Sequence, residues 1–228
     1  MSFNIPPLRV VVVAICAVFP WAIKRRLLTL LLGYKIDPSA RIGISIVDSG
    51  LVIMDKHARI GNFTICKGLN RFVLSEHARI GNLNWITGSA QRKRERLGKN
   101  INRDCSLVLG MHSAITHRHY IDCSGSLTLG PFSTLAGVRS QVFTHSIDLS
   151  ESRQATEPVI IGDYCLVGTG SILLPGAVLP NYSVLGAGSV LRRGVDKEWS
   201  LYSGVPAIHV RDIPRDTAYF GRETGFIE

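Results

Sequence analysis

The chain has 228 residues, of which 46 % are hydrophobic, 19 % are charged and only 7 % are aromatic. This composition excludes a disordered chain, while 22 glycines and 10 prolines indicate many turns rather than long helices. The formal net charge of +9 requires an anionic partner, and nucleic acid, a phospholipid surface and a phosphate-bearing substrate are the candidates. Five cysteines without any Cys-x-x-Cys pair argue against a disulfide framework and a zinc site, and they fit a reducing compartment.

The first predicted element is an apolar segment, residues 1–35. Its apolar run at 10–19 covers about ten residues, whereas one membrane-spanning helix needs about 20. Basic residues follow this run at 24–26 instead of preceding it, so the segment does not read as a signal peptide. We expect residues 5–34 to form a helical, interfacial or re-entrant attachment to the cytoplasmic face of the cell membrane, with Trp21 at headgroup depth. The alternative is a helix that packs on the rest of the protein or on a neighbouring subunit.

A repeat and a basic run come next. The hexapeptide HARIGN occurs at 57–62 and again at 77–82, a separation of 20 residues. The run QRKRERLGK at 91–99 holds five basic residues against one glutamate, and a solvated loop is its simplest interpretation. No aromatic residue interleaves with these charges, so we expect no nucleic-acid partner.

A histidine-rich stretch and a polar excursion follow. The stretch 110–125 contains His112, His117 and His119. Asp122 is the first residue of the next unit of the six-residue repeat described below. Further on, residues 144–158 form a polar excursion that opens with the letters THSID and ends at a proline.

A period of six residues then dominates the sequence. From residue 161 onward an aliphatic residue recurs every six positions, at Ile161, Val167, Leu173, Leu179, Leu185 and Leu191. Small residues follow four positions later, at Cys165, Ser171, Ala177, Ser183 and Ser189. Ile115, Ile121 and Leu127 show the same period. This period suits a chain that turns a corner every six residues, so that three sides form a coil of about 18 residues and each side is a short parallel strand. Cys105 and Cys123 are 18 residues apart, which predicts that they stack in adjacent coils as core or corner thiols.

The hexads, the terminal run 158–193, the tail motif SGVPA at 203–207 and the excursion after THSID resemble the hexapeptide-repeat acyltransferases. They look closest to the subgroup that O-acetylates sugars of surface polysaccharides. The resemblance covers about residues 36–211 and leaves 212–228 as a tail. It implies an all-β, left-handed parallel β-helix, a homotrimer with sites between subunits, and acetyl-CoA as the acyl donor, with no metal.

The resemblance also implies site residues. His145 occupies the place of the catalytic base, which takes the proton of a sugar hydroxyl as that hydroxyl attacks the thioester. Asp122 or His119 would hold the acceptor or orient the imidazole, although either could instead be a corner residue that bonds to local backbone.

The resemblance also assigns, by position, the residues that would contact coenzyme A. The resemblance implies that Thr169 and Ala187 meet the pantetheine arm. Arg192 and Arg193 stand where the family often has Thr-Lys, and Arg211 matches a residue that meets the adenosine phosphates. Ile208 departs from the Lys or Arg that often follows the tail motif.

Two other functions stay open. His112 and His117 have the five-residue spacing of two ligands in γ-class carbonic anhydrases, although the rest of that pattern is not visible. A non-enzymatic β-helical scaffold on a membrane is the second alternative, with 91–99 as its docking surface. The acceptor is not identified by the sequence; a lipid-diphosphate-linked sugar is a hypothesis, and the acyl group could be longer than acetyl.

Overall fold

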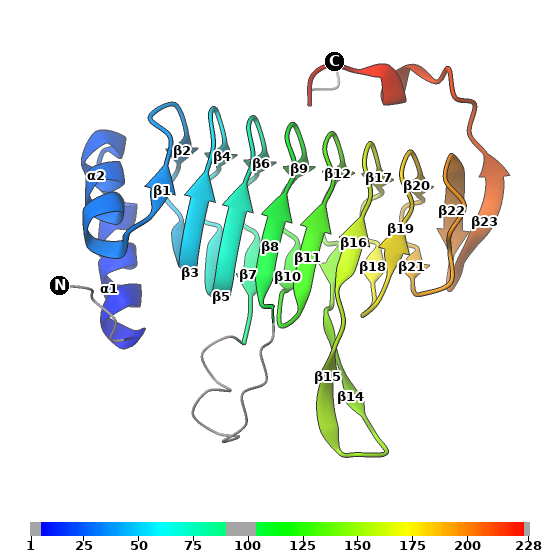
Figure 1. Ribbon diagram of the computed structural model, residues 1–228, viewed down its shortest axis with the longest axis horizontal. Coiled ribbons are helices and arrows are strands. Elements are labelled where there is room, and N and C mark those ends of the chain that lie inside the picture. Colours follow the sequence, from blue (N-terminus) through cyan, green and yellow to red (C-terminus); the bar gives the residue numbers. More distant parts are fainter. Residues whose placement is uncertain (1–5, 90–103, 226–228) are drawn as a thin grey trace.

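The computed structural model describes residues 6–89 and 104–225. The chain forms a prism of stacked coils, one coil being one turn of the chain around the prism axis (Figure 1). Two helices lie at the N-terminal end of the prism, and the C-terminal tail runs back along one of its edges. The basic run at 91–99 lies outside the described residues.

Strands of two sheets make the three faces and pair in parallel, except for the last two strands of the chain, which are antiparallel. The 12-stranded sheet supplies two faces, because the long strand β5 pairs with β7 along its first half and with β8 along its second. Its strands are β1 (Lys35–Ile36), β3 (Ile46–Met54), β5 (Ile65–Leu74), β7 (Trp85–Thr87), β8 (Ser106–Leu109), β10 (Tyr120–Asp122), β11 (Ser126–Leu129), β13 (Gln141–Val142), β16 (Val159–Ile161), β18 (Ile172–Leu173), β19 (Val178–Leu179) and β21 (Val190–Leu191). The nine-stranded sheet, called here the second sheet, supplies the third face with β2 (Arg41–Ile42), β4 (Arg59–Ile60), β6 (Arg79–Ile80), β9 (Ala114–Ile115), β12 (Thr134–Leu135), β17 (Leu166–Val167), β20 (Val184–Leu185), β22 (Ser200–Gly204) and β23 (Ala207–Asp212).

The core confirms the period of six. The aliphatic residues at the six hexad positions from Ile161 to Leu191 are fully buried, and Ile115, Ile121 and Leu127 are at most 1 % exposed. The register also pairs the two HARIGN repeats, with Arg59 opposite Arg79. The architecture is therefore a parallel β-helix; its left hand stays a prediction.

One detail of the predicted register is wrong. Strand β8 pairs with β11 so that Ser106 lies opposite Ser126, a coil of 20 residues. In this register Cys105 does not lie opposite Cys123. The Sγ atom of Cys105 donates a hydrogen bond to Ser124 O at 3.2 Å. This coil is two residues longer than three hexads. The extra residues lie at a corner between two faces, so the length of the corner sets the length of the coil. Both thiols are still buried core groups.

Stacked rings line one corner of the prism. This corner stack comprises His57, His77, His112, Phe132, Tyr164, Tyr182 and Trp199, whose neighbouring ring centroids lie 4.3–5.5 Å apart. Each of the seven residues has a positive φ of 54–58°, the left-handed conformation that this tight corner requires. His57 and His77, the first residues of the two HARIGN repeats, thus lie at corners of stacked coils.

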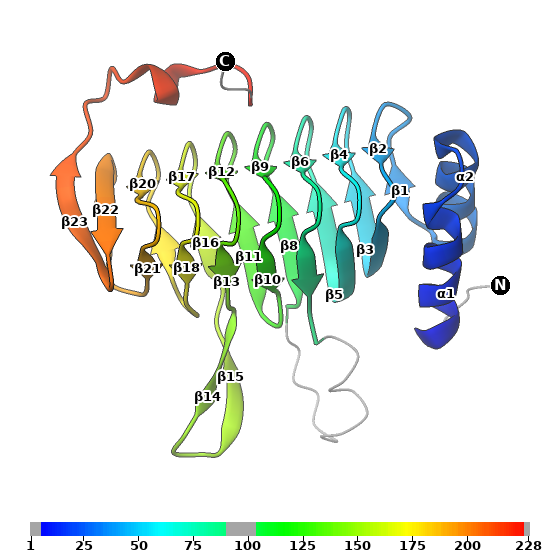
Figure 2. The same ribbon diagram turned by 180° about the vertical axis from the view of Figure 1, so that it is seen from behind.

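The tail after β23 runs back along one edge of the prism (Figure 2), and its side chains contact part of this stack. A 3₁₀ helix at Ala218–Gly221 places Phe220 edge-on to Tyr182 and Trp199. Arg222 lies over the Tyr164 ring and donates to Phe132 O. The tail thereby reaches the middle of the prism, where Gly225 N donates to His112 Nδ1.

The N-terminal helices α1 (Pro6–Ala17) and α2 (Trp21–Leu32) close one end of the prism. Val13, Cys16 and Leu28 are at most 2 % exposed and join the core. Other apolar side chains at this end face outward: Ile15 of α1 is 56 % exposed, Leu30 of α2 is 80 % exposed, and Val18, which follows α1, is 73 % exposed. Among the described residues, no helix combines the length and the hydropathy needed to cross a bilayer.

Candidate active site

An antiparallel hairpin carries His145 to the edge of the prism. After β13 the chain leaves the coil to form β14 (His145–Asp148) and β15 (Arg153–Thr156), and it returns at β16 (Figures 1 and 2). His145 pairs with Thr156 at the foot of this hairpin, where Glu157 N donates to Thr144 O. The predicted excursion at 144–158 is thus an ordered hairpin, and His145 lies at its rigid base.

Asp122 lies beside His145 on the preceding coil. Strand β10 pairs with β13 up to Ile121 and Val142, so the residues that follow these two meet at the same corner. There the Nδ1 atom of His145 lies 2.8 Å from Asp122 Oδ2. The carboxylate is 7 % exposed and the imidazole 35 % exposed, so the pair has a buried side and an open side.

Local hydrogen bonds hold the Asp122 carboxylate in place. Oδ1 accepts from Ser124 Oγ at 2.7 Å, and Oδ2 accepts from Thr144 N at 3.1 Å. Burial by itself would raise the pKa of Asp122, but hydrogen bonds from His145 and Ser124, together with the His145 charge, lower it below its ordinary value. Asp122 is therefore ionised at neutral pH.

The ionised carboxylate determines the state of the imidazole. Because Asp122 Oδ2 can only accept, His145 Nδ1 carries a proton and donates it. Nε2 of the neutral ring then holds a lone pair on the exposed side. An oriented imidazole with a free nitrogen is suited to general-base chemistry.

His119 lies at the other end of β10 from Asp122. It is 2 % exposed, its Nδ1 accepts from Ser140 N at 3.1 Å, and its Nε2 lies 3.0 Å from Thr116 Oγ1. Burial, with the His117 charge as a smaller contribution, lowers the pKa of His119 to about 4. Both ring nitrogens are engaged in corner bonds, which favours the structural alternative for His119 over a role beside His145.

Thr169 and Ala187 occupy successive coils at one corner, where Gly188 N donates to Thr169 O. The glycine after each of them, Gly170 and Gly188, has a positive φ, and an added Cβ would meet no atom within 4 Å. This corner is therefore open to a ligand that runs along the coil axis.

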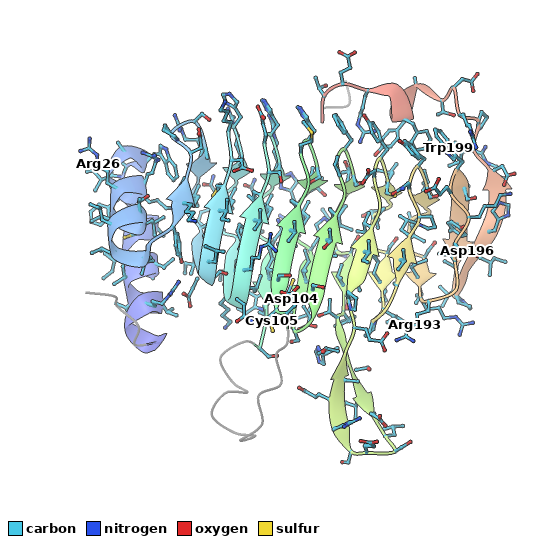
Figure 3. All side chains as sticks on the ribbon, in the orientation of Figure 1. Arg26, Asp104, Cys105, Arg193, Asp196 and Trp199 are labelled. Atoms are coloured by element: carbon cyan, nitrogen blue, oxygen red, sulfur yellow. The ribbon has the colours of Figure 1, made fainter. Side chains whose placement is uncertain are left out.

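The predicted phosphate-binding arginines lie elsewhere on the prism. Arg192 and Arg193 follow β21 on the same edge as the hairpin, where Figure 3 shows Arg193, and both are exposed. Arg193 forms an ion pair with Glu157 at the hairpin foot. Arg211 lies on β23 opposite Leu201. One protomer does not bring these arginines together with Thr169 and Ala187.

His112 and His117 lie at opposite ends of β9 at different corners. His112 belongs to the corner stack, and His117 Nδ1 accepts from Asn82 N at 2.8 Å. Within 6–89 and 104–225 no three His, Cys, Asp or Glu side chains cluster as metal ligands would. Burial raises the pKa of the Cys66, Cys123 and Cys165 thiols, so these cysteines are poor nucleophiles.

Three contributors to the site were missed in the sequence. Thr144 and Ser124 hold the Asp122 carboxylate, and Glu157 anchors the hairpin to Arg193. The Asp-x-Ser spacing of 122 and 124 is a local signal for such a side-chain turn. The Thr144 and Glu157 contacts join residues of different coils and carry no local signal.

No family model matches the chain. Among solved structures, the polysialic acid O-acetyltransferase OatWY superposes with a TM-score of 0.57 at 18 % identity, over 82 % of this chain and 90 % of that one. A mutant of AntD, an N-acyltransferase from Bacillus cereus in complex with dTDP-4-amino-4,6-dideoxyglucose and coenzyme A, gives a TM-score of 0.56 at 18 % identity, over 71 % and 83 % of the two chains. A hexapeptide-repeat acetyltransferase from Vibrio cholerae O1 biovar eltor, complexed with acetyl-CoA, gives 0.51 at 19 % identity, over 64 % and 73 %.

Similarity at these identities concerns the fold. The three proteins come from more than one substrate class, and all are acyl or acetyl transferases by name. The chain shares with them the parallel β-helix of the hexapeptide-repeat acyltransferases.

Proposed function

We propose that the chain is an acetyl-CoA-dependent O-acetyltransferase that acts on a sugar hydroxyl in the synthesis of a surface polysaccharide or another glycan. The observation that carries this proposal is the His145–Asp122 pair at the foot of the hairpin, with the imidazole half-exposed and its carboxylate partner buried. A hydroxyl, unlike an amine, must lose a proton as it attacks, and a single oriented base supplies that need. The names of the similar structures agree with sugar-linked acceptors and a coenzyme A donor.

In the proposed mechanism His145 Nε2 takes the proton of the acceptor hydroxyl while the hydroxyl oxygen bonds to the acyl carbon. Acetyl-CoA, when bound, supplies the thioester whose carbon–sulfur bond breaks. His145 then gives the proton to the departing thiolate, so no acyl-enzyme forms. Asp122 holds Nδ1 and stabilises the imidazolium that exists between the two proton transfers.

The open corner at Thr169 and Ala187 has room for the extended pantetheine arm of coenzyme A. The guanidinium groups of Arg192, Arg193 and Arg211 are suited to binding its phosphates. These groups lie on separate edges of one prism. We therefore propose a homotrimer in which coenzyme A lies between neighbouring copies. The exposed apolar side chains of α1 and α2 support a peripheral position on the cytoplasmic face of the membrane, and a lipid-linked glycan is the acceptor class that this position favours.

The His145→Ala variant tests the activity. Release of free thiol from acetyl-CoA is measured with neutral and acidic oligosaccharides, and acetylated product is identified by mass spectrometry. We expect wild-type turnover to fall by about 10²–10⁴-fold in the variant, with coenzyme A affinity unchanged. His209→Ala, which changes an exposed histidine on β23, is the matched control. A folded His145→Ala protein with wild-type turnover would contradict the proposal and favour the non-enzymatic scaffold.

A further inference from the structure

Aromatic side chains gather on the face of the prism that ends at the His145 corner. Strands β7, β10 and β13 are successive neighbours on this face, and their register places Trp85 opposite Tyr120. Both side chains face solvent, and they are 40 % and 44 % exposed. Phe143 follows β13, and its ring centroid lies 6.2 Å from that of Tyr120, with the two rings tilted by 45°. These three rings are called here the aromatic strip.

The aromatic strip leads to the proposed catalytic base. Asp122 is two positions after Tyr120 on β10, and His145 is two positions after Phe143 on the next coil. Alternate residues of an extended chain project to the same side. The side chain of Thr144 is accordingly buried, whereas Phe143 and His145 on either side of it are partly exposed. A ligand that lies on the strip therefore has one end beside the imidazole.

The strip extends from the base toward the N-terminal end of the prism. In the sheet, β7 and β10 lie on the side of β13 that faces α1 and α2, whereas β18 and β21 lie on the other side (Figure 2). The proposed contacts of coenzyme A, at Thr169, Ala187, Arg192 and Arg193, belong to the coils of that other side. The donor site thus takes the C-terminal coils and leaves the strip to the acceptor.

The chemistry of the strip is complementary to a chain of sugars. One face of a pyranose ring consists of C–H groups, which pack against the electron-rich face of an aromatic ring while the hydroxyl groups stay in water. Neighbouring strands are about 4.8 Å apart, which is close to the length of one sugar unit in a chain. Lys67 Nζ lies over the Trp85 ring, 5.1 Å from its centroid, and its ammonium group can donate to sugar oxygens. Rings on three successive coils therefore match the repeating units of a glycan.

We propose that the aromatic strip binds the sugar units next to the one that is acetylated, so that the acceptor is a glycan of at least three units. The unit beside His145 reacts, the next unit packs on Tyr120 and the third packs on Trp85. The identity of the reacting unit rests on the proposed acyl transfer, whereas binding of a glycan to the strip does not need that chemistry. Trp85 and Tyr120 then determine the preferred length of the acceptor.

Titration calorimetry of the full chain with oligosaccharides tests the strip independently of turnover. The probes are a neutral and an acidic series, oligomers of N-acetylglucosamine and of galacturonic acid with one to four units. We expect the affinity for at least one series to rise about tenfold or more from one unit to three. Trp85→Ala should remove the gain that the third unit contributes, and Trp85→Phe should keep most of it. Affinity that does not rise with length in either series would overturn the proposal.

Val178→Ala is the matched control. Val178 is an apolar residue of similar exposure, 41 %, and it lies on β19, on the other face of the 12-stranded sheet. The control should keep the wild-type affinities within about twofold, and losses equal to those in Trp85→Ala would contradict the assignment. Light scattering should give Trp85→Ala the same mass as the wild type. Loss of assembly in this variant would instead assign the strip to a contact between copies of the chain.

Kinetics separate this inference from the acyl transfer itself. His145→Ala should keep the length dependence of binding but not acetylate the oligomers. In Trp85→Ala we expect the KM for the trisaccharide to rise about tenfold, toward that for the monosaccharide, with kcat and the KM for acetyl-CoA within about threefold. Length-dependent binding without turnover in the wild type would contradict the proposed function alone. Turnover that does not depend on acceptor length would contradict the strip alone.

Discussion

Asp122 joins two coils at the candidate site, because its carboxylate accepts hydrogen bonds from Ser124 on its own coil and from Thr144 and His145 on the next. Such a carboxylate both aims the imidazole and stabilises its protonated form. Its side chain does not reach the reacting atoms in the proposed mechanism. Asp122 is therefore a positioning residue.

Asp122→Asn separates this role from a structural one. The neutral amide can still accept from Nδ1, but it cannot stabilise the imidazolium, so we expect kcat to fall about 10²-fold or more while KM for acetyl-CoA stays within about threefold. Asp148→Asn is the control, because the bonds of that hairpin carboxylate among the described residues come from the backbone of Ser150 and Glu151. Steady-state kinetics of both variants measure the difference. Equal kcat values for Asp122→Asn and Asp148→Asn would show that Asp122 has no role in the mechanism.

His119 gives the fold a pH dependence. Its pKa of about 4, lowered by burial, lies below the value of about 6.5 in an unfolded chain. Between these values the unfolded state binds more protons, so His119 stabilises the fold fully above pH ~6.5 and this contribution falls as the pH drops toward ~4, by at most about 3 kcal/mol. Urea unfolding at several pH values should show that fall in the wild type and in His209→Gln, and a smaller one in His119→Gln. A slope that His119→Gln leaves intact would assign the effect to other groups.

At the scale of elements, the corner stack and the C-terminal tail stabilise each other. Figure 3 shows Trp199 beneath the tail, and the tail's Phe220 is 7 % exposed against Tyr182 and Trp199. The rings at this corner were not predicted as a stack, because aromatic residues occur at irregular intervals of 17 to 35 residues in the sequence. The long interval between Phe132 and Tyr164, for example, contains the hairpin of β14 and β15, which leaves the prism at another corner and does not interrupt the stack.

Phe220→Ala tests the contribution of the tail. Removing the ring leaves a cavity beside Trp199, and we expect the free energy of unfolding to fall by about 2–4 kcal/mol. Ile208→Ala, at a side chain that is 65 % exposed, should change it by less than about 0.5 kcal/mol. Chemical denaturation of both variants measures the difference. Equal effects would mean that the tail only rests on the prism.

The whole molecule has an apolar end. The helices α1 and α2 bury one face on the first coil, while Val18 after α1 and Leu30 on α2 are exposed. Figure 3 shows Arg26 at the outer surface of α2. The structure confirms the alternative in which the helices pack on the rest of the protein. Membrane attachment stays a prediction, which the exposed apolar side chains of these helices favour. A basic residue beside exposed aliphatic ones favours an anionic membrane surface.

A double variant, Val18→Asp with Leu30→Asp, tests that attachment. Each side chain gains burial in the lipid interface, so charge at both positions should weaken binding to phosphatidylglycerol vesicles at least about tenfold in a flotation assay. Val210→Asp, at an exposed position on β23 at the far end of the prism, is the control. Undiminished flotation of the double variant would exclude this end as the membrane contact.

The spacing of the hexads is enough to predict the prism. A period of six with an aliphatic residue at each repeat has one compact solution, because every such residue must turn inward when the chain turns a corner at the same interval. The tail motif and the excursion at 144–158 likewise predict His145 as the catalytic base. The period, the tail motif and the excursion are patterns of residues that lie near one another in the sequence, so they can be recognised without the structure.

The contacts between side chains of different coils depend on the three-dimensional register. The bonds of Asp122 with Thr144 and His145, the pairing of Arg41 with Arg59 and of Arg59 with Arg79, and the seating of the tail join residues 18 or more positions apart. Their pairing depends on the length of each corner, which the register fixes and which a six-residue period does not contain. The misplacement of Cys105 against Cys123 has that same cause, since two extra residues at a corner shift every contact across it.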